Sequence, residues 1–277
     1  MSFPLGRLAR RLLPSAGGDQ SPGGDTWGPP PLPAPGTRRV TTGFFDRYPR
    51  FFETSETSPQ PWRLNLRYEA IFAEHADLLT GASVLDIASH DGRWSLAALE
   101  TGARSVVGIE ARADLVRAAE QNLRLSGADQ TAYTFVAGDV FDVLEVDPVK
   151  VDVVLCLGFL YHTLRFNELW TRIRECRPGH VLVDTMVKPG ETRPMVHLFQ
   201  EPTSRQGNAV DDAFSYGGRV LVGRPSLAAL EVMGRSHGFR LESLSDWGGL
   251  IRDNPEARGI GDYRAGRRVT AHFVAAT

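Results

Sequence analysis

The stretch from Val84 to Glu110, VLDIASHDGRWSLAALETGARSVVGIE, decides the fold. An apolar run over 83–87 predicts a strand, and a short turn containing a glycine follows it. Residues 93–100 have the pattern of a helix, and a second apolar run over 105–109 ends in the acid Glu110. Strand, glycine turn, helix, strand and terminal acid together form the nucleotide-binding half of a doubly wound sheet.

The residues of the turn indicate what kind of nucleotide fits. Turns that bind NAD follow G-x-G-x-x-G and place a pyrophosphate on the helix N-terminus. This turn, DIASHDG, has a single glycine, Gly92, and two acids that would repel a pyrophosphate. Small Ala88 and Ser89 allow backbone N–H groups to approach a ligand. The acids suit a cationic ligand with an amino acid end, and Glu110 can accept both hydroxyls of a ribose.

The pattern D-x-A-x-x-x-G, with an acid about two dozen residues later, resembles the class I methyltransferases that use S-adenosylmethionine. The more usual form in that family is D-x-G-x-G-x-G, so Ala88 and His90 depart from it. The resemblance implies cofactor contacts in this region by Asp86, Ala88, Ser89, His90, Gly92, Trp94, Glu110 and Ala111.

Later segments fit the same family in order, so the resemblance covers about 83–277. Hydrophobic patterning predicts helices at 114–126 and 225–237, and strands at 133–137, 151–157, 180–186, 239–244 and 268–275. The resemblance also implies cofactor contacts by Gly138, Asp139, Val140, Leu157 and Gly158, with Asp139 at the adenine amino group. The expected fold class is α/β, a Rossmann-like doubly wound seven-stranded sheet.

Composition divides the chain into three parts. Residues 1–40 are basic and rich in Pro and Gly, which predicts a disordered tail. The aromatic segment 41–80 predicts an N-terminal helical cap, in which Phe44 to Phe52 could form a lid, pack on the sheet or make a homodimer interface. Residues 81–277 form the expected methyltransferase domain, and an insertion at 187–223, after the fifth strand, shapes the acceptor site.

Charge and hydropathy indicate which classes of partner and which cellular location to expect. The net charge of −2 and the pI near 6.4 do not favour nucleic acid. No apolar run is long enough for a transmembrane helix, and the N-terminus lacks the apolar centre of a secretory signal. Cys156 and Cys176 are expected to be buried reduced thiols, so the expected location is cytoplasmic. Nearly all basic residues are arginine, which is typical of GC-rich genomes such as those of actinobacteria.

The catalytic candidates follow the fourth and fifth strands. The sequence Gly158-Phe-Leu-Tyr-His162 is similar to the fourth-strand motif of a methyltransferase subset that includes enzymes modifying tRNA wobble uridine. His162 is the leading general base, because imidazole titrates in the right range; otherwise it hydrogen-bonds its own loop. Tyr161 orients the acceptor or packs beside the cofactor. Asp184 binds a hydroxyl, orients other side chains or faces solvent.

The acceptor is expected to be a hydroxyl of a small molecule, most of all a sugar or oligosaccharide, because the insertion is polar. The resemblance extends to actinobacterial saccharide and natural-product O-methyltransferases, including the methylmannose polysaccharide enzymes of mycobacteria. The alternatives are an RNA-modifying enzyme, an enzyme for apolar acceptors, and a non-catalytic scaffold that binds S-adenosylmethionine. His197, Asp211 and Asp212 suggest a divalent metal, which their irregular spacing does not favour.

Overall fold

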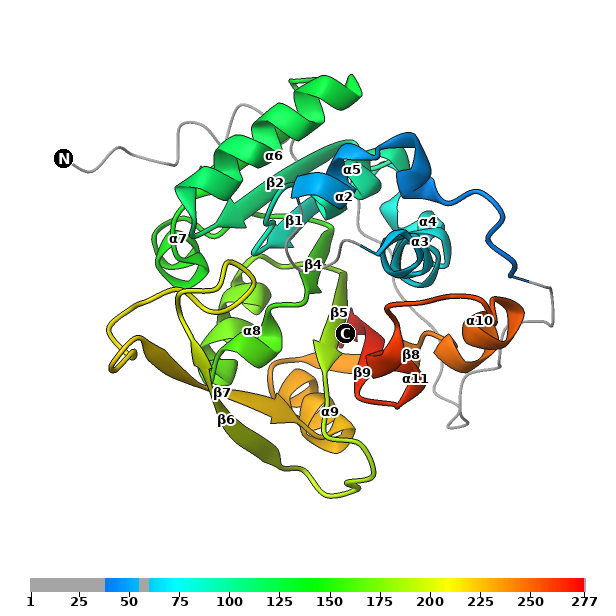
Figure 1. Ribbon diagram of the computed structural model, residues 1–277. Helices are drawn as coiled ribbons and strands as arrows, with labels where there is room; N and C mark the ends of the chain where they lie inside the picture. Colours follow the sequence, from blue (N-terminus) through cyan, green and yellow to red (C-terminus); the bar gives the residue numbers. More distant parts are fainter. Residues whose placement is uncertain (1–37, 55–59, 277) are drawn as a thin grey trace.

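The structure is a computed structural model that describes residues 38–54 and 60–276. The predicted tail therefore lies outside the described residues, apart from positions 38–40. Figure 1 shows a central sheet with helices on both sides, a separate hairpin at one end, and the N-terminal helices beside α5 (Arg93–Glu100).

Short helices fill the segment that precedes the sheet. They are η1 (Phe44–Arg47), α2 (Arg50–Thr54), α3 (Pro61–Tyr68), η2 (Glu69–Ala73) and α4 (Ala76–Leu79). Phe45 and Phe72 are fully buried, and their ring centroids lie 5.6 and 5.7 Å from that of Trp94. Aromatic pairs at such separations add to the stability that burial provides. The aromatic segment thus packs against helix α5 through Trp94.

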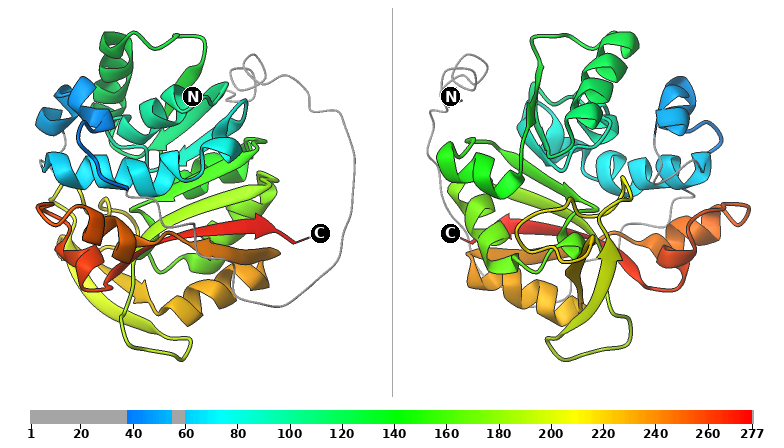
Figure 2. Two further views of the ribbon diagram at one scale, coloured as in Figure 1. Left: turned by 90° about the vertical axis from the view of Figure 1, so that its right-hand side faces the viewer. Right: turned by 60° about the vertical axis from the view of Figure 1, so that its left-hand side comes forward.

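The main sheet has seven strands in the order β3-β2-β1-β4-β5-β9-β8. Their bounds are β1 (Ser83–Ile87), β2 (Ser105–Glu110), β3 (Tyr133–Ala137), β4 (Val153–Leu157), β5 (His180–Met186), β8 (Phe239–Leu244) and β9 (Arg268–Ala275). The first five are parallel, and β9 runs antiparallel between β5 and β8. Figure 2 shows β9, in red, beside the parallel strands. The predicted doubly wound seven-stranded sheet is confirmed.

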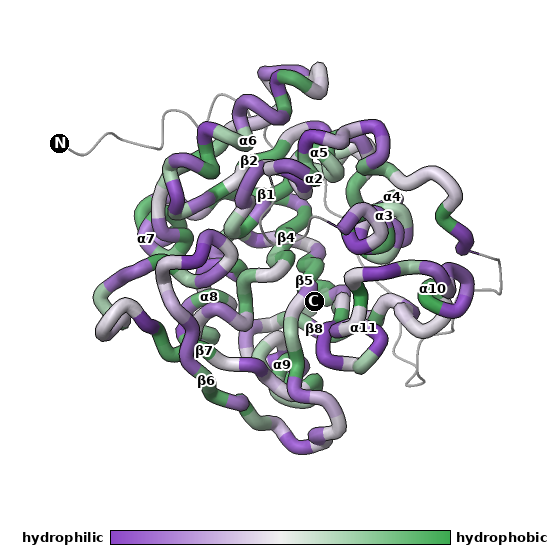
Figure 3. The backbone as a smooth tube through the Cα atoms, viewed as in Figure 1, coloured by the Kyte–Doolittle hydropathy of each residue, from purple (hydrophilic) through white to green (hydrophobic). Residues whose placement is uncertain are grey.

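Strand residues alternate between two apolar layers, as the two-residue period of a strand requires. Val84 and Val153 pack with the N-terminal helices and α5 (Arg93–Glu100). Leu85 and Val154 pack on the opposite face. Both faces of the central strands are therefore covered, which explains the continuous apolar run along β4 (Figure 3).

The remaining helices lie between the later strands of the chain and pack around the sheet. They are α6 (Ala113–Ser126), α7 (Val140–Val146), η3 (Leu160–His162), α8 (Phe166–Glu175), α9 (Leu227–Ser236), α10 (Trp247–Asp253) and α11 (Gly261–Arg264). Among the described residues, none of the helices combines the length and the apolar character that crossing a lipid bilayer requires.

The turn after β1 explains why the resembled motif prefers glycine. Ala88 and His90 have positive φ values of 54° and 52°, and Gly92 has a φ of 81°. L-residues rarely adopt this left-handed region, whereas glycine does so without a steric penalty. The two departures from the glycine pattern are therefore strained residues, and such strain is commonly found at binding sites.

The insertion after β5 folds as an antiparallel hairpin that the sequence did not predict. Strands β6 (Val196–Pro202) and β7 (Arg219–Pro225) form their own two-stranded sheet, in which Phe199 is opposite Val222. Leu198 and Leu221 are exposed on it, so the pattern lacks the clear alternation that predicts a strand. The hairpin lies apart from the main sheet, at the lower left of Figure 1.

Candidate active site

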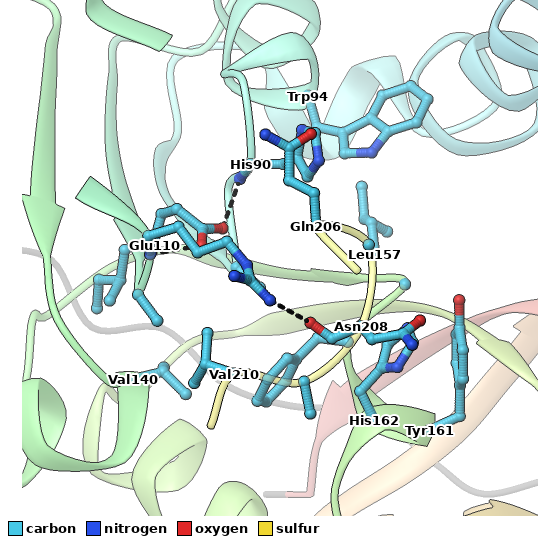
Figure 4. A pocket seen from close by; sticks show the side chains of 18 of the residues that line it. His90, Trp94, Glu110, Val140, Leu157, Tyr161, His162, Gln206, Asn208 and Val210 are labelled. Carbon is cyan, nitrogen blue, oxygen red and sulfur yellow. Dashed lines mark hydrogen bonds between the residues drawn. The ribbon is translucent and has the colours of Figure 1, made fainter. Parts of the chain in front are cut away.

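A pocket opens at the carboxyl ends of β1, β2, β3 and β4, where open α/β sheets bind ligands. Most of the expected site residues line it: Ala88, His90, Trp94, Glu110, Ala111, Gly138, Asp139, Val140, Leu157, Gly158, Tyr161 and His162. Figure 4 shows Glu110 and Val140 on one side of the pocket, and Tyr161 and His162 on another. Asp86, Ser89 and Gly92 do not line the pocket.

Asp86 lies beneath the turn rather than in the pocket wall. It is fully buried, and Ser95 Oγ donates to its Oδ2 over 2.7 Å. Its Oδ1 has no hydrogen-bond partner among the described residues. Burial raises the pKa of Asp86 to about 7, because a carboxylate loses hydration there. Direct contact between Asp86 and a ligand, as the resemblance implied, is not what this geometry shows.

Glu110 is held firmly at the end of β2. Its Oε2 accepts the backbone N–H of His90 over 3.0 Å, and its Oε1 accepts the backbone N–H of Arg112 over 2.9 Å. Each carboxylate oxygen has two lone pairs, so each retains one for a ligand. The strained turn thus fixes an acid whose free lone pairs can accept the two hydroxyls of a ribose.

Asp139 begins α7 and divides its two oxygens between the helix and the pocket. Oδ1 accepts the Phe141 N–H over 2.7 Å, which caps the helix. Oδ2 has Arg165 Nη1 at 3.9 Å, which is too far for a hydrogen bond. Partial burial raises the pKa of Asp139 above its ordinary value. Oδ2 is therefore suited to accept a ligand amino group.

His162 is paired with a carboxylate that sequence reasoning missed. Its Nδ1 lies 2.6 Å from Oε1 of Glu201, a buried residue of β6. The backbone N–H of Ala209 donates to the same oxygen over 2.8 Å. A carboxylate partner places the proton of a neutral imidazole on Nδ1, which leaves Nε2 as an acceptor. No motif marks Glu201, because it comes from the insertion hairpin.

Tyr161 and Asp184 are connected through Arg268. Arg268 Nη2 donates to the Tyr161 hydroxyl over 2.7 Å, and Nη1 donates to Asp184 Oδ1 over 2.6 Å. Asp184 is fully buried, and it also accepts from Arg67, Tyr263 and Thr270. Burial alone would raise the pKa of Asp184, but the charges of Arg67 and Arg268 hold it below the ordinary value.

The geometry does not favour a direct contact between Asp184 and a substrate. Donors occupy both carboxylate oxygens, and the residue does not line the pocket. Asp184 also does not face solvent, which was another of the three possibilities raised by the sequence. Its contacts favour the third alternative, in which Asp184 orients Arg268 and, through it, Tyr161.

Arginines from distant segments also line the pocket; the sequence had suggested Arg63 and Arg67 as ligands of an anionic acceptor or as a solvated helix face, and had not assigned the others to the site. These arginines are Arg63, Arg67, Arg93, Arg112 and Arg268. The Arg67 guanidinium lies 4.5 Å from the centre of the Trp94 ring, and its buried Nε has no hydrogen-bond partner among the described residues. Arg63 and Arg268 both bind Asp262. The residues of this wall therefore provide cationic groups for an anionic part of a ligand.

A loop of the insertion closes one side of the pocket, and Arg112 holds it there. Residues 206–210 line the pocket. Arg112 Nη2 donates to the carbonyl oxygens of Thr203 and Arg205 over 3.2 and 3.1 Å, and lies 3.4 Å from that of Asn208. Because Arg112 directly follows the Glu110 segment, the loop is tied to the proposed ribose site.

The residues considered for a metal do not gather into a site. His197 is exposed on β6, Asp211 has Thr203 Oγ1 at 3.4 Å, and Asp212 accepts the Phe214 N–H over 2.9 Å. Within the described part of the chain, no group of three or more His, Cys, Asp or Glu side chains is arranged to hold a metal ion.

Comparison with known proteins agrees with the fold. Residues 84–178 match the family described as "Methyltransferase domain". The solved structure of a DhpI–SAH complex is 17% identical, covers 84% of this chain and 98% of that chain, and gives a TM-score of 0.54. A protein from Pyrococcus horikoshii OT3 is 16% identical, covers 84% and 100%, and gives 0.53. A comparison with curated proteins finds no match. Residues 84–178 thus match a methyltransferase domain, and the chain has the class I methyltransferase fold.

Proposed function

We propose that the protein transfers the methyl group of S-adenosylmethionine to a hydroxyl of a small molecule, a sugar or oligosaccharide. The main observation behind this proposal is the layout of a single pocket. Glu110 and Asp139 lie on one side of it, and the His162–Glu201 pair lies on another. The first two residues suit an adenosine, and the pair suits a hydroxyl that must lose its proton.

The pocket residues fit the parts of S-adenosylmethionine. Glu110 has lone pairs for ribose hydroxyls, and Asp139 Oδ2 has one for the adenine amino group. The Arg67 side chain lines the pocket and places a positive charge there for the methionine carboxylate. When bound, the sulfonium supplies an activated methyl group.

His162 serves as the general base. A hydroxyl becomes a competent nucleophile as its proton leaves, and Nε2 is the free acceptor of this imidazole. The Glu201 carboxylate, 2.6 Å from Nδ1, stabilises the imidazolium that forms. Tyr161, held by Arg268, lies next to His162 with ring centroids 4.1 Å apart and limits where the acceptor can sit.

The assignment to a sugar rests on a second cavity beside His162. Tyr161, His162, Gly207 and Asn208 line both this cavity and the pocket. Its wall also contains Glu201, Arg205 and the ring of Phe199. Hydrogen-bonding groups around an aromatic face suit a polyhydroxylated ring better than an apolar acceptor.

A labelled-methyl assay tests this proposal. Purified protein and S-adenosylmethionine carrying a labelled methyl are incubated with neutral and acidic sugars, with a fatty acid, and with unmodified tRNA as a separate arm. The proposal expects label in a sugar fraction, and far less with His162→Gln. Transfer to tRNA alone would assign the protein to RNA modification. Tight cofactor binding without transfer in any arm, under conditions that saturate the cofactor, would favour the scaffold.

A further inference from the structure

The second cavity contains an arginine without an acidic partner. Arg224, on β7, lines this cavity and is half-buried. Its guanidinium carbon lies 4.3 Å from the centre of the Phe199 ring. Its Nε is buried and has no hydrogen-bond partner, and its guanidinium makes no ion pair with any residue in the described ranges 38–54 and 60–276.

Several partly or fully buried arginines elsewhere in the described chain do have acidic partners. Arg165 pairs with Glu168 over 2.7 Å, and Arg172 pairs with Glu175 over 3.1 Å. Arg268 is held by Asp184 and Asp262. Buried or half-buried arginines are normally paired, because an unpaired donor loses hydration without compensation. Arg224 is therefore a cation whose counter-ion is not supplied by the described protein residues.

The one carboxylate on the cavity wall is already engaged. Glu201 accepts from Ala209 N–H and pairs with His162 Nδ1. Arg205, which is exposed, also lines the cavity, so the charged side chains of this wall carry a net positive charge. A cavity with this balance attracts an anion in preference to a neutral group.

The contact with Phe199 also bears on how an anion would be bound. A guanidinium that lies over an aromatic ring keeps its N–H groups in its own plane, where they remain free to donate. Two parallel N–H donors match the two oxygens of a carboxylate or a phosphate. Phe199 comes from β6 and Arg224 from β7, so the hairpin itself presents this donor edge.

We propose that the methyl acceptor carries an anionic group, a carboxylate or a phosphate, that Arg224 binds in the cavity beside His162. This inference rests on the proposed function for the role of the site, and it narrows the sugar class to acidic or phosphorylated sugars. Arg224 is then a specificity-determining residue: it holds the anionic group while His162 faces the hydroxyl.

Arginine side-chain NMR tests anion binding without a known acceptor. Full-length protein saturated with S-adenosylhomocysteine is titrated with sodium phosphate, and separately with sodium acetate, against sodium chloride at constant ionic strength. The Arg224 Nε–H signal is assigned by its loss in Arg224→Lys. We expect this signal to shift saturably in the millimolar range with at least one of the two anions, and the more effective anion identifies the group.

Two variants keep the test decisive. The backbone amide signal of Asn208, which also lines the cavity, serves as a second reporter of anion binding. In Arg224→Gln, the anion affinity read from this signal should fall at least tenfold. Arg219→Gln, on the same strand but exposed and bonded to Gln200, should leave it unchanged. An Arg224 signal that does not move, that moves equally with chloride, or an Asn208 response retained in Arg224→Gln overturns the proposal. S-adenosylhomocysteine affinity, measured on the same samples, reports separately on the proposed function.

Discussion

His162 Nδ1 lies 2.6 Å from the Glu201 carboxylate, although 39 positions separate the two residues. One side chain follows the fourth strand of the sheet, and the other belongs to the insertion hairpin. The contact joins the part of the pocket that suits the cofactor to the cavity that suits the acceptor. Under the proposed function, the contact also makes the insertion hairpin part of the catalytic site.

Removing either member of this pair should lower turnover more than cofactor binding. We expect His162→Gln to reduce kcat by about 10²- to 10⁴-fold, the usual contribution of a general base. Glu201→Gln keeps a hydrogen bond but loses the charge, so a smaller loss of about tenfold is expected. Steady-state kinetics with the acceptor found in the labelled-methyl assay, together with S-adenosylhomocysteine titration, measures both quantities.

The matched control for this pair is Glu231→Gln, which removes a surface carboxylate that pairs with Arg235. It should leave kcat unchanged, because exposed ion pairs contribute little. If kcat of Glu201→Gln equals that of the wild type, Glu201 only supports the fold of the hairpin.

The strained turn after β1 predicts an unusual response to glycine. Ala88→Gly relieves a positive φ but loses a methyl group, so the free energy of unfolding should stay within about 0.5 kcal/mol of the wild type. Ala97→Gly, in the buried middle of α5, should cost about 1–2 kcal/mol, because a helix interior disfavours glycine. Urea denaturation of both variants measures the difference. Equal destabilisation would mean that Ala88 is not strained.

The Arg112 contacts predict that this residue keeps the pocket closed. Arg112→Ala removes the donors to the carbonyls of Thr203 and Arg205, so residues 206–210 should exchange their amide hydrogens faster. S-adenosylhomocysteine should also dissociate faster, by about tenfold if the loss equals one charge-assisted hydrogen bond. Arg117→Ala, at an exposed position of α6, provides the control. Unchanged exchange and dissociation in Arg112→Ala would show that the loop does not gate release.

Three histidines on and beside the neighbouring strands β5 and β9 make stability depend on pH. His180 Nδ1 lies 3.0 Å from His272 Nε2, and the His75 and His272 ring centroids are 5.2 Å apart. Burial lowers the pKa of all three, to about 4 for His272. The unfolded chain then binds more protons below pH 6.5, so this contribution to stability is complete above that pH and is lost as the pH falls towards 4.

Denaturation at several pH values tests the histidine cluster. Between pH 6.5 and 5 the wild type should lose about 1 kcal/mol more than His272→Gln, after allowance for partial exposure of the ring. His197→Gln, on an exposed position of the hairpin, should behave as the wild type. An identical pH slope in His272→Gln would remove this cluster as the cause.

The positions of the main strands along the chain could be predicted from the sequence, because each strand is a compact apolar segment. The segments 133–137, 180–186 and 268–275 coincide with β3, β5 and β9. The hairpin formed by β6 and β7 could not be read in this way, because it pairs outside the main sheet and exposes apolar residues such as Leu198.

The site was less accessible to sequence reasoning than the fold. Residues near the strand ends, such as Glu110 and His162, were found because their place follows from the motif. Glu201 and Arg224 were not assigned to the site, because their position beside it depends on how the hairpin packs against the rest of the protein. The sequence left three roles open for Asp184, because its partners Arg67 and Arg268 lie far from it in sequence.

The most direct test of the central claim is isothermal titration of the full chain with S-adenosylhomocysteine, with NAD as the control ligand. The wild type should bind S-adenosylhomocysteine with a dissociation constant of about 1–100 μM. Glu110→Ala should bind at least tenfold more weakly, and NAD should not bind. Equal affinity in Glu110→Ala, or binding of NAD alone, would contradict the assignment of this pocket to S-adenosylmethionine.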